Sequence, residues 1–209
     1  MAQAAARGRR DCTALDVFAG RERPWPGLTL PAERTYLIRM LEVTFRAPEP
    51  GDEAQLAEAQ RIMAVEGFDF AFDFTPGENF EKWLELQVDH RLGKNVASGW
   101  VASTFELALV EGQIAGRLSV RHALNDVLLR WGGHLGYGVL PPFRGQGVAK
   151  RMLQRGLQLT AQLGIQRVLV TCDEDNAASR RIIEGGGGVY ESSYVGAGIN
   201  RPIRRYWFG

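Results

Sequence analysis

The sequence predicts an α+β domain with a mixed, mostly antiparallel central sheet that is flanked by helices. Three observations predict this fold class. Strand-like and helix-like stretches follow one another in the order β-α-α-β-β-β-α-β-α-β-β. A central β-α-β crossover needs one parallel strand pair, whereas the hairpins need antiparallel pairs. The chain has 209 residues, 45% apolar and 23% charged, which fits a single globular domain.

The first 39 residues differ from the remainder of the chain. They contain seven Arg and four Asp or Glu without a sustained period, and Pro24 and Pro26 flank a tryptophan. We therefore expect a disordered N-terminal extension over residues 1–39 and one domain over residues 40–209. A basic arm that binds nucleic acid or a partner is the alternative interpretation of this extension.

The first half of the domain is predicted to contain a strand, two helices and a hairpin. LEVTFRA alternates like a strand, and a hairpin is expected over 100–124, where Glu111-Gly112-Gln113 joins two strands. The helices are expected over 48–67 and 78–93. Their apolar positions are Leu56, Ile62 and Met63 in the first and Phe80, Trp83, Leu84 and Val88 in the second.

Between these helices, GFDFAFDF places phenylalanines and aspartates at period two. A half-buried segment with a solvated acidic side is the favoured interpretation. An aromatic wall with carboxylates for a cationic amine is the alternative.

The second half is predicted to alternate strands and helices. Strands are expected over 134–140, 167–172, 188–195 and 204–208, and helices over 148–164 and 177–184. The longer helix is expected to bury one face and to end before Gly164. That face consists of Val148, Met152, Leu159 and Leu163.

Bulk properties exclude several classes of protein. A net charge of +1 disfavours a nucleic-acid partner, and no apolar run reaches the roughly 20 residues that would span a membrane. The N-terminus lacks the apolar segment of a secretory signal. Cys12 and Cys172 form no metal-binding spacing and are not expected to form a disulfide, which fits a reducing cytoplasm.

The segment RGQGVA, residues 144–149, opens a helix directly after an apolar strand and Pro141-Pro142. The first turn of a helix has unpaired N–H groups and a partial positive charge, so it can bind a phosphate where small residues leave room. Gly145 and Gly147 leave that room, Gln146 offers a side-chain N–H, and Arg144 adds a charge. A turn that simply needs glycine is the alternative.

The stretch from Gly133 to Tyr190 resembles the GNAT superfamily of acyl-CoA-dependent N-acyltransferases. RGQGVA matches the family signature Arg/Gln-x-x-Gly-x-Gly/Ala, VLP matches the end of the preceding strand, and DEDNAASRRIIEGGGG matches the second half. The longer patterns WVASTFEL, RHALND, GGHLGYGV and RRYWF are similar to a bacterial branch of predicted acetyltransferases.

The resemblance implies binding of acetyl-CoA as co-substrate, without a metal, and acetylation of a primary amine by direct attack in a ternary complex. The acceptor would be a small-molecule amine or a protein amino group. Val139 and Leu140 would pair their backbone with the pantetheine arm as if it were an added strand, and a backbone N–H near Val139 would polarise the thioester carbonyl. The backbone N–H groups of Gly145 to Ala149 would hold the pyrophosphate. The implied cofactor-binding residues are Val139, Leu140, Arg144, Gly145, Gln146, Gly147, Val148, Ala149, Asn176 and Ser179.

The catalytic groups are less defined. Many family members carry a tyrosine in the last helix as general acid, and its place falls at or beside Ile183. Tyr137 and Tyr190 are the candidate substitutes, with water as a third source of the proton. His134 is the first candidate for the base, and its alternative role is a structural hydrogen bond. His122, Glu106 and a water chain are further candidates.

Two other functions fit the same residues. The missing tyrosine motivates a non-catalytic acyl-CoA-binding or regulatory module, and an N-acyltransferase that uses a longer acyl-CoA would need the same pyrophosphate turn. Paired subunits are common in folds of this type, so a homodimer is compatible with the resemblance.

Overall fold

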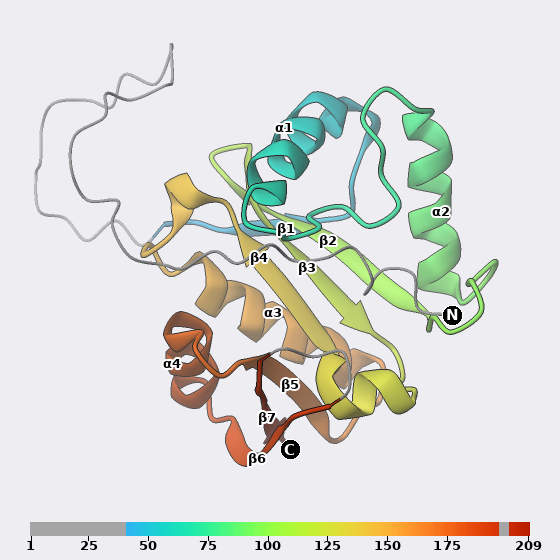
Figure 1. Cartoon of the computed structure of the whole chain (residues 1–209). Helices are drawn as coiled ribbons and strands as arrows, with labels where there is room; N and C mark the ends of the chain where they lie inside the picture. The colour runs from blue at the N-terminus through green and yellow to red at the C-terminus, as the bar shows by residue number, and fades with distance from the viewer. Residues whose placement is uncertain (1–40, 197–200) are drawn as a thin grey trace, which may run out of the picture.

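The computed structural model of the protein describes residues 41–196 and 201–209. The expected N-terminal extension, residues 1–39, lies outside the described residues. The described elements follow the predicted order (Figure 1). The strands are β1 (Thr44–Arg46), β2 (Ser103–Val110), β3 (Gln113–Arg121), β4 (Leu135–Val139), β5 (Val168–Asp173), β6 (Val189–Tyr194) and β7 (Ile203–Phe208). The helices are α1 (Glu53–Ala64), α2 (Phe80–Leu92), α3 (Val148–Gln162) and α4 (Ala177–Gly185), with the short turns η2 (Pro50–Asp52), η3 (Leu128–Gly132) and η4 (Pro141–Phe143).

The strands form one seven-stranded sheet in the order β1-β2-β3-β4-β5-β7-β6. Its neighbouring strands are antiparallel except for β4 and β5, which are parallel. The predicted mixed, mostly antiparallel sheet is therefore confirmed. The parallel pair arises because α3 carries the chain across the sheet between these two strands.

Helices cover both faces of the sheet. On β2, Phe105 and Leu107 pack with α1 and α2, whereas the alternating residue Ala108 packs in the core beneath α3. In Figure 1, α1 and α2 lie over the half of the sheet formed by β1–β3, and α4 lies beside β5 and β7. The two apolar cores thus lie on opposite faces, and the sheet separates them.

The β2–β3 hairpin turns at Glu111 and Gly112, as predicted. Both residues have positive φ, 50° and 78°. Two consecutive left-handed residues are typical of the two-residue turn whose twist matches that of paired strands.

The buried face of α3 is rotated from the predicted one. Val148 and Met152 are buried as expected, but the face continues through Gly156 and Thr160, whereas Leu163 is 43% exposed. A Cβ atom at Gly156 would lie only 2.9 Å from the Leu135 side chain of β4. Because Gly156 has no side chain, α3 can pack closely against the sheet there. The buried face of the helix is therefore the one that contains Gly156.

The C-terminal half of α2 also departs from its predicted apolar stripe. Phe80 and Trp83 are buried, but Val88 is 57% exposed. His90 takes the buried position instead and stacks against Trp100, with ring centroids 6.3 Å apart.

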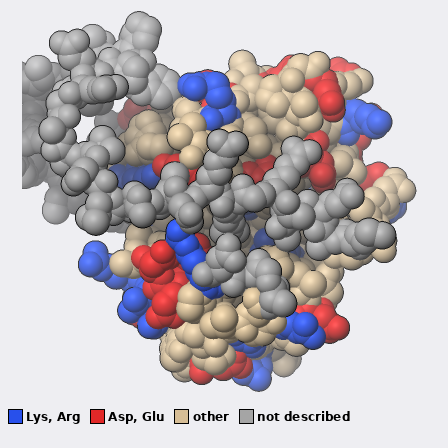
Figure 2. Space-filling model, in the orientation of Figure 1, with Lys and Arg blue, Asp and Glu red and all other residues tan. Residues whose placement is uncertain are grey.

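The segment between α1 and α2 confirms the predicted solvated acidic side. Phe70 and Phe74 are buried, whereas Asp69 and Asp73 are exposed. The segment forms bends and turns rather than a strand, and the Gln60 side chain accepts hydrogen bonds from the Phe70 and Ala71 N–H groups, both 2.8 Å. On the face seen in Figure 2, Lys and Arg side chains are interspersed with Asp and Glu.

Candidate functional site

The centre of the sheet contains an opening between β4 and β5. β4 forms five registered residue pairs with β3, but only one with β5, Leu135 with Val170. Past this pair no further β4–β5 pairing follows in the described part of the chain, and the two strands separate. Backbone groups on the β5-facing edge of β4 are thereby left without a strand partner.

The direction of these backbone groups follows from the pairing of β4 with β3. The Leu140 N–H donates to the Ala115 carbonyl on β3, 2.9 Å. Because backbone groups alternate in direction along a strand, the N–H and C=O groups of Tyr137 and Val139 face the opening. Of the two residues expected to pair with pantetheine, Val139 alone therefore directs its backbone there.

Beyond β4, the chain forms the predicted glycine turn. η4 is followed by Gly145 at φ +74° and Gly147 at φ +84°, and α3 begins at Val148. A Cβ atom at either glycine would meet nothing within 4 Å, so the left-handed backbone rather than crowding explains the glycines. No side chain caps the N–H groups of the first turn of α3, which suits that turn to an anion.

The polar side chains of this turn brace it internally. Arg144 donates its Nε–H to the Val139 carbonyl, 3.0 Å, and forms two hydrogen bonds with the Glu66 carboxylate, 2.9 and 2.7 Å. Gln146 donates to the Pro142 carbonyl, 2.7 Å. The turn therefore offers an anion chiefly its backbone N–H groups, because the side chains predicted to help already have partners.

Tyr137 directs a buried hydroxyl to the α3–α4 side of the opening. This hydroxyl has no hydrogen-bond partner among the described residues. Burial raises the pKa of Tyr137 to about 12, with a smaller increase from Cys172 and an opposing effect of the Ser179 hydroxyl, which lies near it without a well-aligned hydrogen bond. The hydroxyl therefore stays protonated at neutral pH and can donate to a group that enters the opening.

The start of α4 borders the same region. Asn176 caps the helix, because its side-chain oxygen accepts the Ser179 N–H, 3.0 Å. Ile183, where the family tyrosine falls, is fully buried in the apolar core beneath α3 and α4. The tyrosine hydroxyl at the opening is therefore that of Tyr137 on β4, whereas residue 183 on α4 provides no hydroxyl group.

His134 joins β4 to β5 at the closed end of the opening. Its ring Nδ1 accepts the Leu169 N–H, 2.9 Å, and the backbone N–H of His134 donates to the Leu169 carbonyl, 2.7 Å. Burial lowers the pKa of His134, and the Arg121 charge acts in the same direction. Protonation of Nδ1 would break the first of these bonds, so the geometry supports the structural role rather than that of a general base.

We expect His134→Ala to lower the free energy of unfolding by about 1–3 kcal/mol near neutral pH, because the buried Leu169 N–H loses its acceptor. Since the pKa of His134 lies below 6.5 in the folded protein, the unfolded chain binds a proton first as the pH falls, and the wild-type protein loses this stability below pH 6.5. Urea unfolding at pH values of about 8 and about 5.5 measures both effects. If the difference in free energy of unfolding between the wild-type protein and His134→Ala is as large at the lower pH as at the higher one, the structural role of His134 would be contradicted.

The other predicted catalytic residues lie elsewhere or have partners. Tyr190 is 48% exposed on the edge strand β6, two strands from β5, and its hydroxyl contacts Ser193. His122 contacts the Thr104 hydroxyl through Nε2, 2.9 Å, and burial lowers its pKa. The structure does not bring these side chains to the opening.

Glu106 is also engaged. It is buried on the face beneath α3 and binds Arg155 through two hydrogen bonds, 2.8 and 2.7 Å. This ion pair explains a charged residue in the middle of a buried strand without a role in proton transfer.

Sequence reasoning missed two arginines on β3, Arg117 and Arg121. Arg117 is 3% exposed and lies between the rings of Phe68 and Phe72, with its guanidinium carbon 4.6 and 4.4 Å from their centroids. Burial lowers the pKa of Arg117 to about 9 and that of Arg121 to about 10. The alternation of RLSVR places both residues on one face, which was the available signal.

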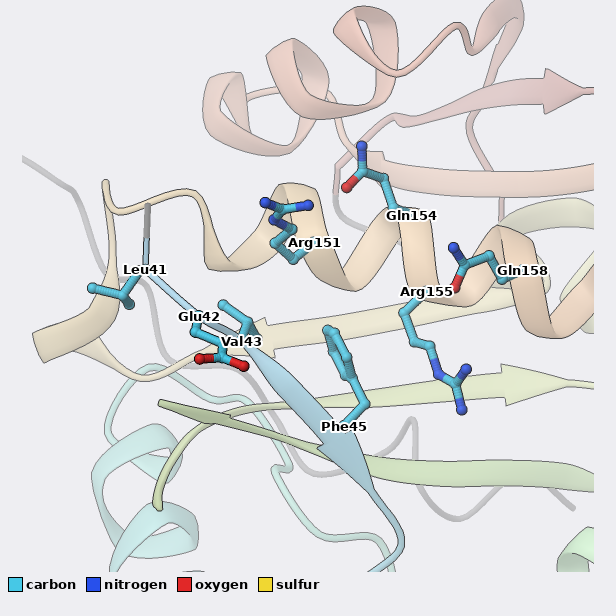
Figure 3. Close-up of a pocket in the computed structure, with 8 residues that line it drawn as sticks. All are labelled: Leu41, Glu42, Val43, Phe45, Arg151, Gln154, Arg155 and Gln158. Atoms are coloured by element: carbon cyan, nitrogen blue, oxygen red, sulfur yellow. The ribbon is translucent and has the colours of Figure 1, made fainter. Parts of the chain in front are cut away.

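A surface pocket of about 400 Å³ lies between β1 and α3, away from the opening. Figure 3 shows that the lining side chains come from two segments, residues 41–45, which lead into β1, and the part of α3 beside them. Its lining residues are Leu41, Glu42, Val43, Phe45, Arg151, Gln154, Arg155 and Gln158. None of them belongs to the glycine turn or to the β4–β5 opening, so this pocket is separate from the candidate site.

Within residues 41–196 and 201–209, no three His, Cys, Asp or Glu side chains lie together as a metal site would require. None of the described helices has the length and apolar character that crossing a membrane would need.

Comparison with known proteins places this geometry in context. Residues 42–189 match the family model described as an acetyltransferase (GNAT) domain. No curated protein matches the chain.

Several solved structures share the fold. One is yncA, a putative acetyltransferase from Salmonella typhimurium with acetyl-CoA, at 16% identity, TM-score 0.54, and coverage of 79% of this chain and 92% of that one. A second, also from Salmonella typhimurium, modifies the N-terminal serine of ribosomal protein L7/L12, at 19% identity, TM-score 0.56, and coverage of 82% and 96%. A third is the microcin C7 self-immunity acetyltransferase MccE with acetyl-CoA and AMP, at 16% identity, TM-score 0.59, and coverage of 80% and 92%.

Proposed function

The chain belongs to the GNAT acetyltransferase family, and we propose that it transfers an acetyl group from acetyl-CoA to a primary amine by direct attack in a ternary complex. Membership makes the protein an acyltransferase. The observation that carries the proposal is the opening past the single β4–β5 pair, which continues into an uncapped helix N-terminus at Gly147. Together they provide an extended strand edge for pantetheine and an anion site for pyrophosphate.

The residues divide this binding between them. The N–H groups from Gly145 to Ala149 would hold the pyrophosphate, since two left-handed glycines keep that surface free of side chains. The Val139 N–H would pair with the pantetheine arm along the free edge of β4, whereas the Val139 carbonyl already accepts a hydrogen bond from Arg144. Asn176 and Ser179 would border the arm from the start of α4.

The reaction joins the amine nitrogen to the thioester carbonyl carbon and breaks the carbon–sulfur bond. A backbone N–H on the free edge of β4 would stabilise the negative charge that develops on the carbonyl oxygen. The Tyr137 hydroxyl would donate a hydrogen bond to the departing sulfur. The ammonium group loses its protons to water, the thiolate takes one proton to become a thiol, and one proton is released overall.

The acceptor class is a small-molecule amine or a protein amino group. The similar structure that modifies the N-terminal serine of a ribosomal protein supports the second class, and the one with AMP supports a small molecule. No described side chain among the candidates is placed as a dominant base, which supports deprotonation through water.

A thiol-release assay tests the proposal. The full chain is incubated with acetyl-CoA and a broad panel of amines and peptides, and release of CoA is compared with hydrolysis in the absence of acceptor. We expect release above that background for at least one acceptor. Binding of acetyl-CoA without release for any acceptor would favour the non-catalytic module. Faster turnover with propionyl- or succinyl-CoA would replace acetyl by a longer acyl group.

A further inference from the structure

Arg117 and Arg121 converge over one residue of β4. Both lie on the face of β3 that packs toward α1 and α2, and Ser119, also buried, lies between them. A Cβ atom at Gly136 would lie 3.5 Å from Arg117 Nη1 and 3.3 Å from Arg121 Nη2. The two guanidiniums thus meet above the backbone of β4, where a larger residue would separate them from it.

These two charges have no carboxylate partner among the described residues. Arg117 donates to the carbonyls of Asp69, 3.1 Å, and Gly136, 3.4 Å, and its buried Nε has no partner. The Asp69 carboxylate instead accepts a hydrogen bond from Gln60, 3.0 Å. Arg121 donates from Nη1 to the carbonyls that end η3, at Gly132 and Gly133.

Arg117 is buried and Arg121 is half-buried, and two adjacent cations removed from water in this way are unfavourable without an anion. Burial lowers the pKa of Arg117, the Arg121 charge lowers it further, and the Asp69 charge opposes both without reversing them. Burial lowers the pKa of Arg121 as well. The surrounding carbonyls and rings stabilise the guanidiniums without neutralising them. An anion between the two forks would supply charge-assisted hydrogen bonds.

The location of the pair links it to the proposed reaction. Gly136 lies between Leu135, which forms the single pair with β5, and Tyr137, which faces the opening. The arginines approach β4 from the α1–α2 face, whereas α3 packs on the other face. A molecule that enters from the α1–α2 face would therefore meet two guanidiniums beside the opening.

We propose that Arg117 and Arg121 bind an anionic group of the acceptor, a carboxylate or phosphate carried close to the amine that is acetylated. This inference rests on the proposed function, because it names the substrate class of that site. It replaces the cationic amine with aspartate partners considered from the sequence, since Phe68 and Phe72 enclose a cation of the protein itself.

Anion binding can be measured without knowing the acceptor. Acetate and inorganic phosphate are titrated separately into the full chain with and without acetyl-CoA, and the arginine side-chain N–H signals are followed by NMR. We expect saturable shifts of the Arg117 and Arg121 signals, and the tighter of the two anions identifies the group. Arg121→Gln should weaken this binding by at least about 10-fold. Arg130→Gln, which removes an exposed arginine, is the matched control and should leave it unchanged.

Turnover provides the second arm. Acceptors are compared in pairs that share an amine, such as amino acids with their amides and aminoethyl phosphate with ethanolamine. We expect kcat/KM to be at least about 10-fold higher for the anionic member, and Arg121→Gln to remove that preference.

The two arms separate this inference from the proposed function. Absence of saturable anion binding in the folded wild-type protein, or equal turnover of charged and neutral partners, would overturn the anion site. Absence of acetyl-CoA binding by calorimetry would overturn the proposed function instead, and the NMR titration would still report on the arginines.

Discussion

Gly147→Glu is expected to weaken acetyl-CoA binding by about 100-fold or more while the protein remains folded. The substitution places a carboxylate at the residue that precedes α3, where the first-turn N–H groups would hold the pyrophosphate. The carboxylate would repel the pyrophosphate, and like charges brought together in a binding site cost several kcal/mol of binding free energy. Each 1.4 kcal/mol lowers the affinity about tenfold. Isothermal titration of acetyl-CoA into the variant measures the loss.

The chain offers a matched control at the other end of the same helix. Gly164 has φ +75°, close to the +84° of Gly147, and a Cβ atom at either position would meet nothing within 4 Å. Gly164→Glu therefore introduces a similar backbone strain, about 1–3 kcal/mol, far from the glycine turn. We expect both variants to lose stability, with Gly164→Glu retaining wild-type affinity for acetyl-CoA. Equal affinities in the two variants would show that the turn does not bind the pyrophosphate.

The glycine turn could be predicted from sequence because its requirements are local. A strand end, a proline turn and two glycines before a helix determine a left-handed backbone and an uncapped N-terminus within a dozen residues. The order of elements was predictable for the same reason, since period and turn residues act over short distances. Which face of α3 is buried could not be predicted in this way, because it depends on how closely Gly156 approaches Leu135 on β4.

The catalytic side chains depend on contacts between distant parts of the chain. His134 is a candidate base by type, but its Nδ1 is occupied by the Leu169 N–H, 35 residues away. Tyr190 is near the end of the motif in sequence, yet it lies on the edge strand. The alternation of β3 predicts that Arg117 and Arg121 share a face. That neither forms an ion pair with a carboxylate of the described residues emerges only once α1, α2 and β4 are packed, because Arg117 then contacts the Asp69 carbonyl and the Asp69 carboxylate contacts Gln60.

Tyr137→Phe is expected to lower kcat by about 100-fold with little change in acetyl-CoA affinity. The substitution removes only the hydroxyl group. A general acid or a hydrogen-bond donor to the reacting atoms typically raises the rate by about 10²- to 10⁴-fold. Because this hydroxyl is buried without a partner in the described residues, its loss should not destabilise the fold, and the free energy of unfolding should stay equal or rise by about 1 kcal/mol. Tyr190→Phe, at an exposed tyrosine of β6, is the control and should retain wild-type kcat.

The pH dependence distinguishes Tyr137 from a group that titrates near neutrality. The pKa of Tyr137, about 12, lies above the ordinary value of 10. The hydroxyl is therefore protonated in the folded protein at every pH at which it is protonated in the unfolded chain. Any stability that this shift contributes is present below pH 10 and is lost only as the pH rises toward 12. The wild-type protein and Tyr137→Phe should therefore give kcat profiles of the same shape between pH values of about 6 and 9, separated by a constant factor. A limb that disappears from the profile of the variant in that range, or an unchanged kcat, would remove Tyr137 from the reaction and leave water as the source of the proton for the thiolate.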